Sequence, residues 1–164
     1  ILKRIFDIFL AFIGTLVCFP IWIIIGLIIK IDSTGPIFYF QSRAGKQGKL
    51  FNIIKFRSMV TDAESGTGPI WSDQHDSRIT RCGKILRRLH IDETPQLINI
   101  LKGDMSIVGP RPERPFFVKK LKDTYPFYSR RLKIRPGVTG WAQINQPFDT
   151  HVRDVHQKLK YDFF

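Results

Sequence analysis

The sequence predicts an α/β protein, mostly helical with one small β-hairpin, whose N-terminal helix enters a membrane. Three observations lead to this expectation. Residues 8–29 carry no charge. The rest of the chain contains short segments with helical or strand-like spacing of apolar residues. The 26 Lys and Arg residues outnumber the 14 Asp and Glu residues, giving a net charge of +12. This excess calls for an anionic partner, such as nucleic acid, an anionic membrane surface or a phosphorylated substrate.

The uncharged run at residues 8–29 is long enough to cross a bilayer core as a straight helix, since it would span about 33 Å. Pro20 lies near its middle, removes a backbone donor and bends a helix. Basic residues flank both ends, with Lys3 and Arg4 before the run and Lys30 after it. This symmetry favours a kinked helix that enters and leaves on one face, but a simple span remains the alternative.

Two short strands follow the turn at residues 32–36. The segments 37–41 and 50–56 have strand-like composition and are separated by a basic loop with two glycines. Lys55 and Arg57 are two positions apart, which places both cations on one face of a strand. That face would meet either a diphosphate or solvent.

Two helices are expected in the middle of the chain. The first covers residues 84–90 and should bury its apolar side chains. These side chains are Ile85, Leu86 and Leu89. The second begins near Pro95, which suits a first helical turn, and ends at Gly103.

Asp92 and Glu93 lie between these helices and form the candidate active site. Asp92 or Thr94 can cap the second helix. The dipole and unpaired N–H groups of a helix N-terminus keep a carboxylate ionised and attract phosphate, and Arg87 adds positive charge. An ionised Asp facing a phosphate is a reasonable nucleophile. The alternative is an ordinary Asp cap with an acidic first turn.

Two constrained loops supply further candidates. Pro110 and Pro112 flank Arg111 and restrict its backbone, so its guanidinium would lose little entropy on binding. A rigid Arg suits bidentate binding of phosphate, although a plain proline-rich turn would have the same composition. The segment 135–145 carries Trp141 and amide side chains that would hold a base or sugar, or simply pack.

Metal and disulfide sites receive little support. Asp73, His75 and Asp76 form a conceivable metal-binding trio, but their polar surroundings favour a solvated surface. Cys18 and Cys82 lack a CxxC pattern or nearby partner ligands, which argues against a structural disulfide or zinc site.

Several segments occur in the order found in one known family. They are residues 3–7 (KRIFD), 55–59 (KFRSM), 92–93 (DE), 101–106 (LKGDMS), 108–112 (VGPRP) and 135–143 (RPGVTGWAQ). With these motifs, nearly the whole chain resembles the bacterial sugar transferases, also called monotopic polyprenyl-phosphate phosphoglycosyl transferases. In that family the nucleophile falls on Asp92 and its partner carboxylate on Glu93.

The resemblance implies a re-entrant membrane helix at residues 1–31 and a cytoplasmic catalytic domain at residues 32–164, located at the bacterial inner membrane and lacking the family's C-terminal membrane-contacting segment. It also implies Mg²⁺-dependent transfer of a sugar 1-phosphate from a UDP-sugar to undecaprenyl phosphate, with release of UMP. This reaction is the first membrane step of capsule, exopolysaccharide, O-antigen or glycoconjugate synthesis. Membrane phospholipids are further expected partners, and the oligomeric state is left open.

The implied chemistry requires countercharge. Bringing a carboxylate to about 4 Å from one phosphate charge costs about 4 kcal/mol at an effective dielectric of about 20. Mg²⁺ held by Asp92 and substrate oxygens would supply part of the positive charge. The candidates for the remainder are Lys55, Arg57, Arg87 and Arg111. The candidates for contacting the nucleotide or sugar are Thr139, Trp141 and Gln143.

The membrane helix departs from the family at one position. Members often have Ser before the helix Pro, where its hydroxyl satisfies a freed carbonyl. Here Phe19 precedes Pro20, so Thr15 is expected to make that bond instead. Asp7, at the start of the run, is expected either to pair with a basic neighbour or simply to lie at the interface.

A noncatalytic membrane anchor, whose basic domain binds anionic lipid or a partner protein, is the rival interpretation. It accounts for the charge and the apolar run but gives no reason for two carboxylates beside a rigid arginine. Nucleic acid is not expected as a partner, because the chain lacks a recognisable nucleic-acid-binding module.

Overall fold

The computed structural model describes residues 1–65, 76–146 and 154–163. Asp73 and His75 lie outside these ranges. Within them, no group of three His, Cys, Asp or Glu side chains is placed to hold a metal ion.

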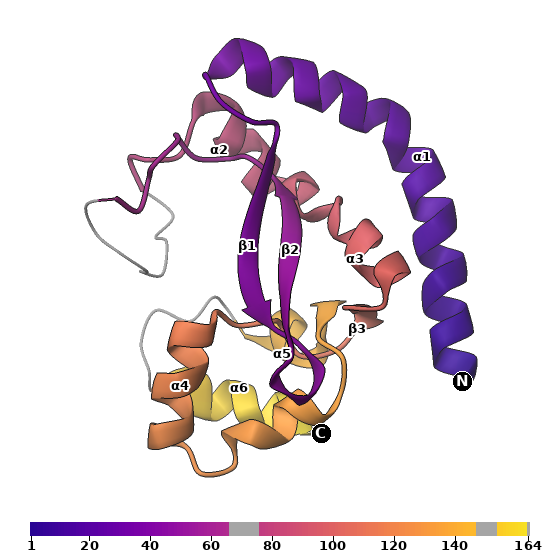
Figure 1. Cartoon of the computed structure of the whole chain (residues 1–164), viewed down its shortest axis with the longest axis vertical. Helices are drawn as coiled ribbons and strands as arrows, with labels where there is room; N and C mark the ends of the chain where they lie inside the picture. The colour runs from indigo at the N-terminus through magenta and orange to yellow at the C-terminus, as the bar shows by residue number, and fades with distance from the viewer. Residues whose placement is uncertain (66–75, 147–153, 164) are drawn as a thin grey trace.

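One long helix is followed by a β-hairpin and a set of short helices and strands (Figure 1). The elements are α1 (Leu2–Asp32), β1 (Phe38–Ala44), η1 (Lys46–Gly48), β2 (Leu50–Phe56), α2 (Arg81–Arg88), η2 (Ile91–Glu93), α3 (Gln96–Lys102), β3 (Ser106–Val108), α4 (Pro115–Thr124), η3 (Tyr128–Lys133), β4 (Gly137–Thr139), α5 (Trp141–Asn145) and α6 (Asp154–Phe163). The expected mostly helical chain with a small hairpin is confirmed.

Helix α1 bends into an arc along one side of the molecule, and one half passes α3 while the other passes α2 (Figure 1). It contains Pro20 and is long and apolar enough to cross a membrane. Most of its apolar side chains are exposed. Its buried residues are Asp7, Ala11, Trp22, Ile25, Gly26 and Ile29.

Both halves of α1 are attached to the rest of the chain. In the first half, Asp7 accepts a hydrogen bond from the Ser106 hydroxyl at 2.9 Å. Lys3 lies 3.3 Å from Asp7, which confirms the pairing of Asp7 with a basic neighbour. In the second half, the Trp22 indole N–H donates to the Thr94 hydroxyl at 2.9 Å. The arc is therefore held to the same domain in both of its halves.

The expected role of Thr15 is wrong. Its hydroxyl donates to the Ala11 carbonyl at 2.7 Å. The carbonyl that loses its helical partner at Pro20 belongs to Leu16, four residues earlier. A helical Thr reaches back to its own i−4 carbonyl, so it cannot serve the following residue.

The hairpin forms the centre of the domain (Figure 1). Strands β1 and β2 are antiparallel, in a register that runs from Phe38 opposite Phe56 to Ala44 opposite Leu50. The Asn99 side chain joins α3 to β2, because it accepts from the Ile54 amide at 3.0 Å and donates to the Asn52 carbonyl at 2.8 Å. This places α3, and the η2 turn before it, beside β2.

A second, parallel strand pair was not anticipated. Strands β3 and β4 pair Ser106 with Gly137 and Val108 with Thr139. A Cβ at Gly137 would lie 2.1 Å from the Gly109 amide nitrogen, so the close approach requires glycine. The pair brings the loop after β3 next to the start of α5.

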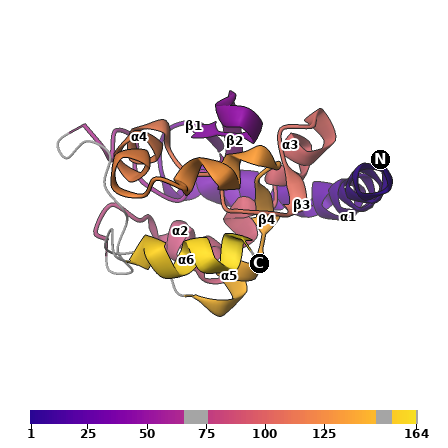
Figure 2. The same cartoon turned by 90° about the horizontal axis from the view of Figure 1, so that it is seen from below.

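Helix α2 exposes part of its apolar surface. Leu86 is buried as expected, but Ile85 and Leu89 are 62% and 59% exposed. The expected inward orientation of these two residues is therefore wrong, because α2 is covered on only one side. Helices α4 and α6 lie on the side away from the N-terminal end of α1 (Figure 1, Figure 2).

Candidate active site

Asp92 and Glu93 lie in the short η2 turn between α2 and α3. Helix α3 begins after Pro95 without a side-chain cap. The Thr94 hydroxyl instead donates to the Ile91 carbonyl at 2.8 Å and accepts the hydrogen bond from Trp22. The prediction that Asp92 or Thr94 caps α3 is therefore wrong, because a separate turn intervenes between the carboxylates and the helix.

Glu93 is held by two cations. Lys55, near the end of β2, donates to Oε1 at 2.7 Å, and Arg111 donates to the same oxygen at 2.6 Å and to Oε2 at 3.3 Å. Burial by itself would raise the pKa of Glu93, but the attraction of Lys55 and Arg111 outweighs it and holds that pKa well below its usual range. Glu93 is therefore a firmly ionised anchor for both cations.

Asp92 has a different environment. It is only 6% exposed, and its carboxylate forms no hydrogen bond or ion pair with any part of the chain that the structure describes. Burial raises the pKa of Asp92, although the nearby positive charges of Lys55, Arg87 and Arg111 oppose the shift. The expected help of a helix N-terminus toward the ionised form is outweighed here, because burial has the larger effect on the pKa and α3 begins further along the chain.

Two more of the predicted residues, Gln143 and Arg87, lie around this pair. Besides its two bonds to Glu93, Arg111 donates through Nη1 to Oε1 of Gln143 on α5 at 3.1 Å. Arg87 donates through Nε to the Ser58 hydroxyl at 2.9 Å, and its charge acts on Asp92. Lys55, Arg87, Arg111 and Gln143 thus come together from four separate elements.

Arg57 is not part of this cluster. It is buried, and its guanidinium donates to the carbonyls of Ser33 at 2.6 Å and Thr34 at 2.8 Å, just after the end of α1. The structure does not place Lys55 and Arg57 on a shared ligand-facing surface. Strand β2 ends at Phe56, and beyond it the strand pleat no longer fixes side-chain direction.

Thr139 and Trp141 lie next to the Arg111 loop. The Thr139 carbonyl accepts from the Gly109 amide at 2.9 Å, and its side chain is half-buried. Trp141 is 54% exposed at the start of α5. Both residues shortly precede Gln143, which bonds to Arg111, so they lie in the segment that leads to this contact.

The sequence did not indicate Ser58 or Arg131. Ser58 belongs to the KFRSM segment and orients Arg87. Arg131 donates through Nη2 to the Arg111 carbonyl at 3.1 Å. No local pattern marks Arg131, since its partner lies 20 residues away.

Comparisons with known proteins identify the family to which the chain is similar. The family model described as "Bacterial sugar transferase" matches residues 1–164. The chain is 41% identical, over 99% of its length, to a UDP-N-acetylgalactosamine-undecaprenyl-phosphate N-acetylgalactosaminephosphotransferase of Aeromonas hydrophila. It is 43% identical, over 88% of its length, to a UDP-glucose:undecaprenyl-phosphate glucose-1-phosphate transferase of Escherichia coli (strain K12).

These two relatives are much longer, and the chain spans 38% of the Aeromonas protein and 31% of the Escherichia coli protein. It is also 44% identical, over 88% of its length, to the exopolysaccharide production protein PSS of Rhizobium leguminosarum bv. phaseoli, and it covers 74% of that protein. Because the family model matches the chain along its whole length and the relatives have this level of identity, the chain belongs to the bacterial sugar transferase family.

Proposed function

We propose that this chain transfers a sugar 1-phosphate from a UDP-sugar to undecaprenyl phosphate through a covalent intermediate on Asp92. The observation that carries the proposal is the buried Asp92 carboxylate, which has no bonded partner among the described residues although Lys55, Arg87 and Arg111 surround it. The names of the relatives, which act on undecaprenyl phosphate, support the substrate class. A noncatalytic anchor would not explain why this carboxylate is left without a partner.

In the first step, an Asp92 oxygen attacks the β-phosphorus of the UDP-sugar. The bond from this phosphorus to the bridging oxygen breaks, and UMP leaves with the electron pair. In the second step, an oxygen of undecaprenyl phosphate attacks the same phosphorus, and Asp92 leaves as a carboxylate. The product is a sugar joined to the lipid through a diphosphate.

The cations lower the repulsion between an anionic nucleophile and an anionic diphosphate. Lys55 and Arg111 are fixed by Glu93, and Gln143 accepts a further hydrogen bond from Nη1 of Arg111. Because the pKa of Glu93 is held low, Glu93 is a weak base in this arrangement. We infer that it orients the lipid phosphate through the two cations that it holds.

The donor set fits Mg²⁺. Both Glu93 oxygens are occupied by cations, whereas the Asp92 oxygens have no such partner in the described chain. One carboxylate together with phosphate oxygens is the kind of site that Mg²⁺ prefers. Asp92 would hold the ion, which when bound would neutralise charge on the diphosphate.

Helix α1 supports the proposal, because its exposed apolar side chains would hold the site close to a membrane. A straight helix of this length would separate its ends by about 45 Å, yet Asp7 near one end and Trp22 in the other half both bond to the same domain. We infer that residues 1–31 dip into one leaflet and return, with exposed apolar side chains in contact with phospholipid. The domain would then lie on the cytoplasmic face of the bacterial inner membrane, where the acceptor phosphate is within reach.

The test is intact-protein mass spectrometry after mixing the protein with Mg²⁺ and individual UDP-sugars, without lipid acceptor. Wild-type protein should gain the mass of one sugar phosphate, mapped to Asp92. Asp92→Asn should gain none, and its UMP release should fall at least about a thousandfold, as loss of a nucleophile does.

Asp123→Asn is the matched control, because Asp123 is an exposed carboxylate on α4. It should carry the adduct like the wild type. An adduct on Asp92→Asn, or UMP release by that variant at the wild-type rate, would refute the proposal.

A further inference from the structure

The backbone of the segment that carries Arg111 is held at every carbonyl. Residues 110–113 offer four successive carbonyl groups, and each accepts a hydrogen bond from a different donor. The donors are the Gly137 amide at 3.0 Å, Arg131 Nη2 at 3.1 Å, Arg43 Nη1 at 3.0 Å and the Ala44 amide at 2.9 Å. Since prolines on either side of Arg111 also fix two backbone torsions, this segment cannot shift without breaking several bonds.

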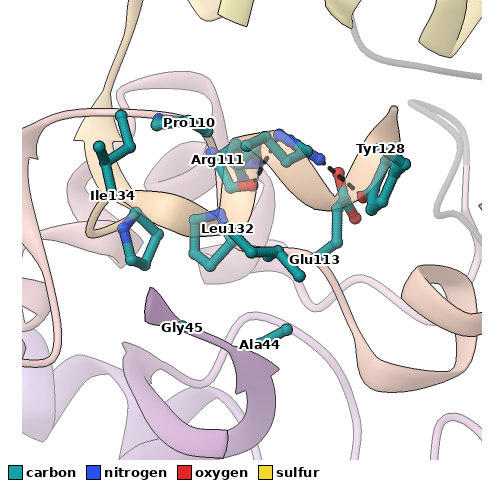
Figure 3. Close-up of a pocket in the computed structure, with 11 residues that line it drawn as sticks. Ala44, Gly45, Pro110, Arg111, Glu113, Tyr128, Leu132 and Ile134 are labelled. Carbon is teal, nitrogen blue, oxygen red and sulfur yellow. Dashed lines mark hydrogen bonds between the residues drawn. The ribbon is translucent and has the colours of Figure 1, made fainter. Parts of the chain in front are cut away.

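Arg131 is the most deeply buried side-chain donor in this set. Its side chain is 2% exposed, and it donates to the Tyr128 hydroxyl at 2.7 Å as well as to the Arg111 carbonyl. Asp162, from α6, lies 2.9 Å from its Nη2 and is 3% exposed. Figure 3 shows Arg111, Glu113 and Tyr128 on one side of a small pocket, facing the hairpin end at Ala44 and Gly45.

A second ion pair lies beside the first. Lys158 of α6 donates to Glu113 at 2.9 Å, and both side chains are largely buried. Burial alone would raise the pKa of Glu113, but Lys158 and Arg131 lower it to about 2. Helix α6 thus contacts Glu113 through Lys158 and Arg131 through Asp162.

Stability alone does not explain this arrangement. A buried ion network is often no more stable than well-packed apolar side chains of the same volume, because desolvation offsets the attraction between charges. Apolar side chains, however, could not hold the Arg111 carbonyl. The feature specific to Arg131 is its hydrogen bond to the Arg111 carbonyl. This carbonyl belongs to the same residue whose side chain contacts Glu93.

We propose that Arg131 is a positioning residue that fixes the backbone of Arg111, and that Asp162 on α6 holds Arg131 in place for this task. This proposal rests on the proposed function in one respect, namely that Arg111 binds the phosphate groups of the substrate. Helix α6 thereby helps to position Arg111 indirectly, through the pair between Asp162 and Arg131.

The test is a double-mutant cycle on UMP release. Arg131→Lys keeps the charge but cannot reach all its partners with one nitrogen. It should lower kcat/KM about ten- to hundredfold in the wild-type background, because misplacing a phosphate-binding group is costly to the rate. In an Arg111→Gln background, the same change should cost less than about twofold.

Arg135→Lys is the matched control. Arg135 donates through Nε to the Gly103 carbonyl at 2.8 Å, so it makes the same type of bond at the end of α3. Its kcat/KM should stay within about twofold of the wild type. Equal losses from Arg131→Lys in both backgrounds, or no loss in either, would overturn the proposal.

Tyr128→Phe is the second variant, to be used if Arg131→Lys does not fold. It removes only the hydroxyl that accepts a hydrogen bond from Arg131. It should lower kcat/KM less than Arg131→Lys, and again only when Arg111 is present. A readout independent of activity is the ¹⁵N guanidinium signal of Arg111 in detergent micelles, assigned by its loss in Arg111→Gln.

This signal should be sharp in the wild type and broadened in Arg131→Lys or Tyr128→Phe. An unchanged signal would contradict the positioning role even if UMP release failed. Absence of UMP release by the wild type would instead refute the proposed function. The guanidinium signal of Arg111 would still test the positioning role of Arg131.

Discussion

The two neighbouring carboxylates of the η2 turn have opposite environments. The side that carries Glu93 is closed by Lys55 and Arg111, whereas on the other side Asp92 is buried without a bonded partner in the described structure. The pKa of Glu93 is lowered and that of Asp92 is raised. The comparison shows how a buried carboxylate can lie among cations without bonding to them, because the neighbouring carboxylate binds two of those cations.

The largest effect on stability is expected at Glu93. Glu93→Gln should lower the free energy of unfolding by about 3 kcal/mol at neutral pH, since it leaves buried cations uncompensated. A carboxyl whose pKa is lowered by folding stabilises the fold above its ordinary value of 4.5, and this contribution disappears as the pH falls. The difference from the wild type, measured by urea unfolding in detergent, should therefore stay constant between about pH 7 and about pH 5 and shrink as the pH falls below 4.5.

Glu64→Gln is the control for the loss of unfolding free energy in Glu93→Gln. Glu64 pairs with Arg114 at 2.7 Å but its side chain is 38% exposed, so the change should cost less than about 1 kcal/mol. A loss at Glu93 that is no larger than at Glu64, or that does not vary with pH, would show that the two sides of the turn are alike.

Much of the local structure could be predicted from the sequence. Strand β2 begins and ends where its composition indicated, and α3 ends at Gly103, whose φ of 94° suits glycine. The motif around Arg111 also identified a residue that the structure brings into contact with Glu93. These features follow from neighbouring residues, whose preferences can be judged without knowing the rest of the fold.

The remainder depends on contacts between distant segments. Lys55 and Glu93 are 38 residues apart, and nothing in either segment indicates their pairing. Strands β3 and β4 have three residues each, too short to show a periodic pattern. Arg57 follows the spacing of Lys55 but turns toward the end of α1, because side-chain direction changes where the strand ends.

A smaller effect of opposite sign is expected at Asp92. Because folding raises the pKa of Asp92, its charged form is disfavoured in the fold, and the stability lost through it grows as the pH rises above the ordinary value of 3.8. Asp92→Asn should therefore raise the free energy of unfolding by about 1 to 2 kcal/mol at neutral pH. The gain should disappear at acidic pH, where the carboxyl is protonated in both states.

Asp123→Asn again serves as the control, and its exposed position predicts a change within about 0.5 kcal/mol. If Asp92→Asn were destabilising at neutral pH, the carboxylate would have to be satisfied by the fold. The contrast between the two acidic residues would then be lost.

The smallest effect should come from the link between α1 and the turn. Thr94→Val removes the acceptor of the Trp22 N–H and the donor to the Ile91 carbonyl, and should lower the free energy of unfolding by about 1 kcal/mol. Since Thr94 directly follows Glu93, kcat/KM for UMP release should also fall, by about threefold. Trp22→Phe removes the same bond from the α1 side, so the double variant should lose little more than the larger single loss. Additive losses would mean that α1 and the η2 turn are held independently, and that α1 does not help to set the position of Asp92 and Glu93.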